Sequence, residues 1–183
     1  GSRMYVPAKI VTHIFVAIGL EAVFSAFNFL IINKQYGLKG SAMMLYSISE
    51  YQYTPFDMSV LDFYFFIVLW KCIGFAIIAI VMTLIAEIVK NTYVVFILII
   101  GFICGSLYLS GFDNGITVVE KIFTMVSPFS LLKTGEIGIT LKEINVYGHF
   151  IPLQNGIFFV QIVLIMIILA ITYLVEKGRR AIR

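Results

Sequence analysis

The chain is a succession of long apolar runs separated by short polar segments. The clearest run, residues 91–112, contains no Asp, Glu, Lys or Arg and is bounded by Lys90 and Asp113. A helix needs about 20 mostly apolar residues to cross a hydrocarbon core roughly 30 Å thick, so this run is long enough to span a bilayer. Because a single segment in lipid must satisfy its own backbone hydrogen bonds, the pattern predicts a transmembrane α-helix here.

Three further apolar runs predict three more spans, at about residues 10–32, 61–86 and 155–175. We therefore expect an all-α fold: a polytopic transmembrane helix bundle of four spans, forming a single transmembrane domain over residues 1–183. The tyrosine-rich segment 33–60 is predicted as a loop lying partly in the membrane interface, with one short amphipathic helix at 41–51, because tyrosine favours the headgroup level.

The segment between the third and fourth predicted spans is too apolar for a plain loop. Written on a helix, residues 116–126 place several apolar side chains on one stripe. Ser127 precedes a proline, which disfavours α-helical backbone and ends that helix. We expect a re-entrant outer segment of two short helices, with Ser127, Pro128 and Phe129 at or near its deepest point. The alternative is an amphipathic segment lying flat on the membrane surface.

Composition agrees with a membrane protein. The chain is 61% hydrophobic and 13% charged, whereas soluble domains carry about 25% charged residues, and its mean hydropathy is +1.01. Its 183 residues leave room for several spans but not for a large soluble domain as well. Cys72 and Cys104 lie inside apolar runs, where free thiols behave as small hydrophobes.

The basic residues predict the orientation. In a four-span topology one side of the membrane holds Arg3, Lys9, Lys90, Lys177, Arg179, Arg180 and Arg183. Cytoplasmic loops carry the excess of Lys and Arg. Five lysines in the loops on the opposite side make the charge difference between the two sides smaller. The basic cluster at the C-terminus nevertheless determines the predicted orientation. We expect a multi-pass protein of the cell (plasma) membrane with both termini cytoplasmic.

No constellation typical of a soluble enzyme is present in the sequence. It has no GxxxxGK[ST] phosphate loop, no HExxH and no CxxC, and its two histidines, His13 and His149, are far apart. We expect no catalytic residue, no metal site, no cofactor and no nucleic-acid partner. Any reaction that consumes ATP must then be run by another chain.

Two charged residues lie within predicted spans. At 1.5 Å per residue, Glu21 is roughly 16 Å from the inner face and Lys71 roughly 15 Å from the outer face, so their depths coincide in a core of about 30 Å. Because each such charge costs about 2.5–3.5 kcal/mol to insert, we expect Glu21 and Lys71 to form an intramembrane ion pair. The pair either holds the bundle together or belongs to a substrate or proton path. Alternatively, Lys71 extends towards the outer interface.

Gly101 and Gly105 form a GxxxG pattern within the third predicted span. Small residues at this spacing let two membrane helices approach closely, so we expect a helix-packing contact there. Ordinary packing is the alternative, because this spacing is common by chance in apolar runs.

Several stretches together resemble the membrane-spanning permeases of ABC type-2 exporters. The opening SRMYVPAKI resembles the cytoplasmic stretch that leads into the third helix of the family, and LIAEIVKNTYVVFILIIG resembles its fourth helix, turn and fifth helix. MVSPFSLLKTGEIG is similar to the SPF/SPL segment between the fifth and sixth helices, which in the family dips into the outer leaflet as short helices. The basic ending EKGRRAIR also resembles that of the family.

This resemblance implies a permease subunit that moves a peptide, lipid-linked or drug-like substrate outward. It also implies two partners: an ATP-binding-cassette ATPase docked on the cytoplasmic face, near Arg3, Lys9 and Lys90, and a second permease copy or paralogue. The family has six helices, so the chain corresponds to the last four, either as part of a longer permease or as a four-span relative. The alternatives are a structural or regulatory membrane subunit without transport of its own and an intramembrane enzyme.

Overall fold

The computed structural model describes most of the chain, with several gaps. The described residues are 5–37, 39–54, 56–89, 91–110, 122, 124–133, 143–146 and 149–181. Arg3 and Lys90, two of the residues predicted to face an ATPase, lie outside these ranges.

Four long helices occupy the four predicted apolar runs: α1 (Tyr5–Tyr36), α2 (Val60–Ile88), α3 (Thr92–Ser110) and α6 (Leu153–Ala181). Three of them are long and apolar enough to cross a membrane, over Pro7–Gln35, Val60–Ile88 and Thr92–Leu109. The described apolar part of α6, Asn155–Ile171, is shorter. The chain is therefore an α-helical bundle in which three of the four long helices have the length and composition of membrane spans.

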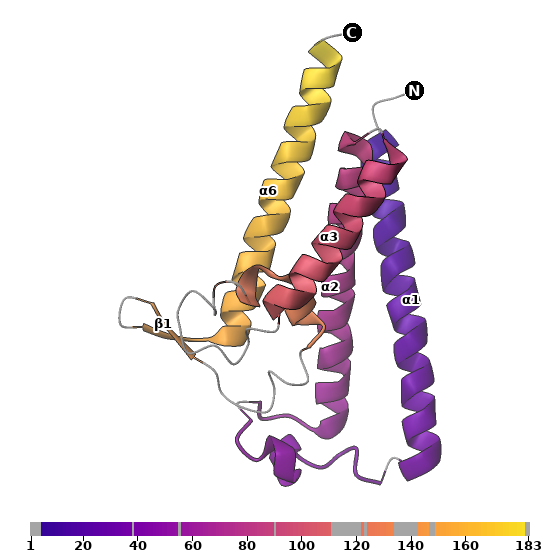
Figure 1. The fold of residues 1–183 in the computed structure, drawn as a ribbon. Helices are drawn as coiled ribbons and strands as arrows, with labels where there is room; N and C mark the ends of the chain where they lie inside the picture. Colours follow the sequence, from indigo (N-terminus) through magenta and orange to yellow (C-terminus); the bar gives the residue numbers. More distant parts are fainter. Residues whose placement is uncertain are drawn as a thin grey trace.

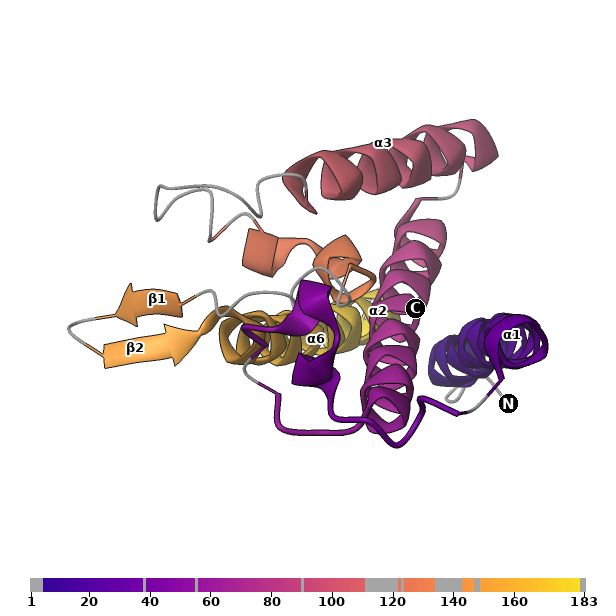
Figure 2. The same cartoon turned by 90° about the horizontal axis from the view of Figure 1, so that it is seen from below.

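Helix α2 is the centre of the bundle. It contacts α1, α3, α6 and the short 3-10 turn η4 (Pro128–Leu131), and in Figure 2 it lies between α1 and α6. In the span window of α2, 22% of the residues are buried, against 6% in α1 and in α3. The start of α1 and the end of α6 lie at the same end of the bundle (Figure 1).

Side-chain caps fix the starts of α2 and α3. The Ser59 hydroxyl accepts a hydrogen bond from the Asp62 amide (3.1 Å) and donates one to the Asp62 carboxylate (2.6 Å). Asn91 accepts from the amides of Tyr93 and Val94, at 3.0 and 3.4 Å. Each cap satisfies amide donors that the first turn of a helix leaves free.

The prediction of an amphipathic helix at 41–51 is wrong. This segment instead forms two 3-10 turns, η1 (Leu45–Ser47) and η2 (Ser49–Tyr51), separated by Ile48 in extended conformation. The cause is long-range backbone pairing: Leu45 donates to the Met58 carbonyl, and Val60 and Leu61 donate to the Met43 and Ser41 carbonyls. These bonds tie the loop to the start of α2, and a continuous helix would break them.

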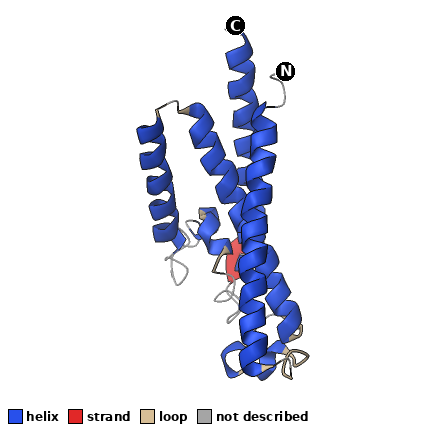
Figure 3. Cartoon of the chain, turned by 90° about the vertical axis from the view of Figure 1, so that its right-hand side faces the viewer, coloured by secondary structure: helices blue, strands red, loops and turns tan. Residues whose placement is uncertain are grey.

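The predicted all-α helical bundle is confirmed, but a short two-stranded antiparallel hairpin beside it was not predicted. β1 (Glu143–Val146) pairs with β2 (His149–Pro152), with Glu143 opposite Pro152. The hairpin directly precedes α6. Apart from the short α2–α3 turn, the described segments outside the long helices gather in the half of the molecule away from the start of α1 (Figure 3).

Candidate functional site

The helical bundle contains a buried break over Ser127–Leu131. Ser127 is extended, with φ −73° and ψ 121°, as expected before a proline, and the 3-10 turn η4 follows it. The side chains of Ser127, Pro128, Ser130 and Leu131 are all buried. Of the first re-entrant helix predicted before this break, only Ile122 and residues 124–126 are described, and they are helical. The glycine-containing return turn at 134–142 lies outside the described residues.

Gly74, the central residue of α2, allows the break to approach this helix closely. A Cβ atom added at Gly74 would lie 3.0 Å from a Leu132 methyl carbon, 3.1 Å from Leu131 Cβ and 3.4 Å from the Pro128 carbonyl oxygen. Any side chain larger than hydrogen would therefore push the turn away. Sequence reasoning missed Gly74, although a single glycine inside a helix costs about 1 kcal/mol relative to alanine and thereby indicates a packing constraint.

Three hydrogen bonds connect the break and the residues just before it to their surroundings. The Ser127 hydroxyl donates to the Ser106 carbonyl of α3 (2.6 Å), and the Ser130 hydroxyl donates to the Thr124 carbonyl. From α6, the Gln161 amide donates to the Met125 carbonyl (2.7 Å). These bonds matter because an unsatisfied backbone group in an apolar interior costs several kcal/mol.

An apolar cluster surrounds the same break. The buried members of this cluster are Ile77 of α2, Met125 just before the break, Leu131 of η4 and Ile157 of α6. Trp70 and Ile73 of α2, with Val160 and Ile165 of α6, pack against them. The break therefore joins α2, α3 and α6 through both apolar packing and hydrogen bonds.

A second polar feature, the α1–α2 seam, runs along the interface between these two helices. Lys9 pairs with Glu87 at 2.7 Å, and His13 Nδ1 lies 2.7 Å from the Thr83 hydroxyl. The Thr83 hydroxyl already donates to the Ala79 carbonyl (2.7 Å), so it accepts from His13, which places a proton on Nδ1.

Further along the seam, the buried Glu21 carboxylate accepts a hydrogen bond from Ser25 (2.9 Å), and the Tyr64 hydroxyl donates to the Ser25 carbonyl (2.6 Å). The seam thus continues from the Lys9 end of α1 past the middle of the helix.

The predicted ion pair between Glu21 and Lys71 is not formed in the described structure. The described residues hold no ion pair at Glu21, and the only cation–carboxylate pair among them is Lys9–Glu87. The depths were counted from the ends of the apolar runs, whereas the Lys9–Glu87 and His13–Thr83 contacts fix the actual register of α1 against α2. That register places Glu21 beside Phe75, Ile78 and Ala79, further along α2 than Lys71.

Because Glu21 and Lys71 form no ion pair, their substitutions are expected to act independently. The changes Glu21→Gln and Lys71→Met should shift the free energy of unfolding additively, within about 0.3–0.5 kcal/mol. Unfolding of the two single variants and the double variant by SDS in mixed micelles measures this. A coupling energy above about 1 kcal/mol would instead indicate a direct ion pair between Glu21 and Lys71.

The Lys9–Glu87 pair is partly exposed, with side-chain exposures of 39% and 20%. We therefore expect a double-mutant cycle with Lys9→Met and Glu87→Gln to give a coupling energy of only about 0.2–1 kcal/mol. The coupling should weaken as salt is added, since salt screens exposed charges. A coupling that is independent of salt would contradict a solvent-accessible pair.

Gly101 and Gly105 make no packing contact within the described chain. Both are exposed, and a Cβ atom added at either would meet no atom within 4 Å. The helix contact predicted for this GxxxG pattern is therefore not made by α1, α2 or α6, and this face of α3 remains open. Cys72 and Cys104 are free thiols, but the burial expected for them is not found: Cys72 is partly buried and Cys104 is exposed among the described residues.

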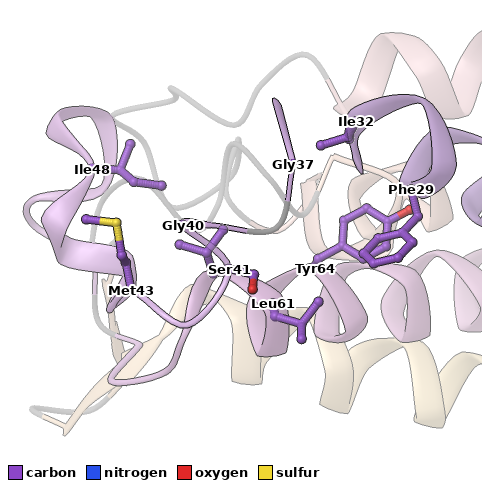
Figure 4. A pocket seen from close by; sticks show the side chains of 10 residues that line it. Phe29, Ile32, Gly37, Gly40, Ser41, Met43, Ile48, Leu61 and Tyr64 are labelled. Atoms are coloured by element: carbon purple, nitrogen blue, oxygen red, sulfur yellow. The ribbon is translucent and has the colours of Figure 1, made fainter. Parts of the chain in front are cut away.

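A cavity lies at the end of α2 that begins with Val60 (Figure 4). It measures about 480 Å³ and is bounded by the end of α1, the start of α2 and the loop between them. Phe29 and Tyr64 form one wall with ring centroids 5.6 Å apart, and Met43 and Ile48 of the loop form another. A second cavity, of about 330 Å³, lies beside Glu21.

Neither a metal site nor a similar known protein helps to assign a function to this geometry. Among the described residues, no group of three or more His, Cys, Asp or Glu side chains is placed to hold a metal ion. No protein-family model, curated protein or solved structure matches the chain.

Proposed function

We propose that the chain is a membrane-spanning permease subunit of an ATP-binding-cassette exporter. In this proposal α1, α2, α3 and α6 are four spans of a plasma-membrane protein, both termini are cytoplasmic, and Ser127–Leu131 belongs to a re-entrant outer segment. The observation that carries the proposal is the burial of this break against Gly74, at the centre of α2.

The depth of the break is the physical argument. If α2 crosses the bilayer, a turn packed on its central residue lies near the middle of the hydrocarbon. Non-helical backbone is tolerated at that depth only where protein covers it or where it lines a water-filled path. Such interrupted segments are typical of transporters, whereas a simple membrane anchor needs only continuous helices.

Two features support four spans with both ends on one side. At 1.5 Å per residue, the apolar run 155–175 within α6 extends about 32 Å, which matches the thickness of the hydrocarbon core. The start of α1 and the end of α6 also lie at the same end of the bundle, as an even number of crossings requires (Figure 1).

The resemblance to ABC type-2 permeases adds the direction of transport and the partners. The buried break lies within MVSPFSLLKTGEIG, the stretch that resembles the dipping segment of that family. In this proposal ATP hydrolysis belongs to a separate ATPase, docked near Arg3, Lys9 and Lys90. The Lys9–Glu87 pair joins α1 to α2 at that end, so a force on one helix reaches the other.

Purification of the tagged full chain from its native membrane in a mild detergent tests this function. We expect an ATPase with a GxxxxGK[ST] loop to co-purify, as identified by mass spectrometry. Lys9→Glu should reduce its recovery, whereas Lys39→Glu, in the loop on the opposite side, should not. Recovery of membrane proteins alone, without an ATPase, would overturn the permease proposal.

The second candidate is a structural or regulatory membrane subunit, and one observation favours it. Helix α3 is apolar, is only 6% buried in its span window and presents an open GxxxG face. Such a face suits a helix of another chain. A second permease copy would use it equally well, so the co-purified ATPase discriminates between the two candidates.

A further inference from the structure

The cavity at the start of α2 has walls that are almost entirely apolar. It measures about 480 Å³ and lies between the last turns of α1, the first turns of α2 and the loop that joins the two helices (Figure 4). Phe29 and Tyr64 line it from the helices, and Met43 and Ile48 line it from the loop. Water gains few hydrogen bonds against such walls. The cavity therefore favours an apolar ligand.

Exposed apolar side chains surround the helix turns that line this cavity. Leu30 and Ile31 of α1 and Phe65 of α2 are each more than half exposed, and the span window of α1 is only 6% buried. In a membrane-spanning bundle such faces contact the acyl chains of lipids, which are as apolar as leucine. Acyl chains are thus the apolar molecules with direct access to the cavity.

The loop over the cavity carries the residues expected at the headgroup level of a membrane. Tyr46 and Tyr53 are 53% and 75% exposed, and tyrosine favours this level. Lys34, in the last turn of α1, and Lys39, next to Gly40 of the cavity wall, are exposed, and neither forms an ion pair within the described part of the chain. Lysine is a common partner of phosphate groups. The cavity therefore lies beside two cations that suit a phosphate.

We propose that this cavity binds one acyl chain of a phospholipid whose phosphate contacts Lys34 and Lys39. The exposed carboxylates of Glu50 and Asp57 belong to the same loop, so a head group with both a phosphate and an ammonium, as in phosphatidylethanolamine, meets both signs of charge. A diacylglycerol has the same chains but no phosphate, and it leaves the lysines unpaired. This bound lipid requires only that the chain spans a membrane, and it is independent of transport.

The test is titration of the purified full chain in detergent with palmitoyl-oleoyl-phosphatidylethanolamine, followed by native mass spectrometry. We expect one lipid to bind saturably to each chain. Palmitoyl-oleoyl-glycerol, which lacks the phosphate, should bind at least about tenfold more weakly. Equal affinities for the two lipids, or no saturable binding of the phospholipid, would overturn the proposal.

Gly40→Phe tests the position of the acyl chain. A Cβ atom added at Gly40 meets only the Met43 sulfur, at 3.6 Å, which is an ordinary van der Waals contact. A phenyl ring there occupies the cavity without a backbone clash and should weaken phospholipid binding at least about tenfold. Gly101→Phe adds the same ring to the open face of α3 and should leave binding unchanged. Unchanged binding by Gly40→Phe, in a variant with normal helical circular dichroism, would contradict the proposal.

The double variant Lys34→Gln, Lys39→Gln tests the phosphate contact. It should weaken binding of the phospholipid at least about tenfold and leave binding of the diacylglycerol unchanged, because only the phospholipid carries the phosphate. Lys34→Arg with Lys39→Arg keeps both charges and should retain phospholipid binding. An equal loss for both lipids, or no loss for the phospholipid, would contradict the phosphate contact. Since the assay contains neither ATP nor an ATPase, its failure is distinguishable from failure of the permease proposal.

Discussion

Replacing Gly74 by valine is expected to destabilise the protein by roughly 1–3 kcal/mol, the usual cost of overpacking a filled interior. The new Cβ atom would lie 3.0–3.1 Å from Leu132 and Leu131 and 3.4 Å from the Pro128 carbonyl oxygen. The backbone of the break would then have to move away from α2. Unfolding by SDS in mixed micelles measures the change in free energy.

Gly101→Val is the matched control for this variant. It makes the same change inside an apolar helix of the same protein, but a Cβ atom at Gly101 meets no atom within 4 Å. Both variants therefore share the effect of a glycine-to-valine change on helix formation. They differ only in the steric clash that valine causes at Gly74. Equal stabilities of the two variants would contradict the close approach at Gly74.

Leu131→Ala is expected to cost about 2–5 kcal/mol, as for other large-to-small changes at buried leucines. Leu131 is 1% exposed and packs with Ile77, Met125 and Ile157, so truncation leaves a cavity where the break meets α2 and α6. Limited proteolysis of the loop between α1 and α2 should accelerate in parallel with the loss of stability against SDS.

Leu98→Ala, in the exposed part of α3, is the control for that truncation. Leu98 is 44% exposed and belongs to no buried cluster among the described residues, so the same chemical change should have little effect. If Leu131→Ala lowers the free energy of unfolding no more than Leu98→Ala does, the break is not part of the core.

The helices themselves could be predicted from the sequence because length and composition determine them. An apolar run of about 20 residues in lipid has no alternative to a helix. Proline chemistry likewise predicted the break at Ser127, since the residue before a proline avoids α-helical backbone. These features depend on local sequence alone.

The register of one helix against another could not be predicted in the same way. Glu21 and Lys71 were placed by counting residues from the ends of the apolar runs, but the contacts of Lys9 with Glu87 and of His13 with Thr83 decide which turns face each other. A displacement of one turn, about 5.4 Å along the axis, changes which side chains face each other.

Contacts that depend on distant segments were also missed. The importance of Gly74 comes from residues 128–132, more than fifty positions later, while the recognisable GxxxG of α3 meets no other described residue. The loop before α2 became two 3-10 turns because backbone hydrogen bonds from Leu45 to the Met58 carbonyl and from Val60 to the Met43 carbonyl cross it. A local hydrophobic pattern contains no information on such pairings.

The depth of the break in the bilayer is the claim on which the four-span topology and the proposed function both depend. Spin labels on exposed positions report this depth without disturbing the core, in a background with Cys72 and Cys104 changed to alanine. Val126, immediately before the break, is the test position, with Ile100 near the middle of α3 and Met43 in the loop before α2 as references. Relaxation by lipid-soluble oxygen, compared with relaxation by a water-soluble nickel complex, gives the depth of each label. We expect the Val126 label to lie as deep as the Ile100 label, and a Val126 label at the shallow level of the Met43 label would contradict the re-entrant segment.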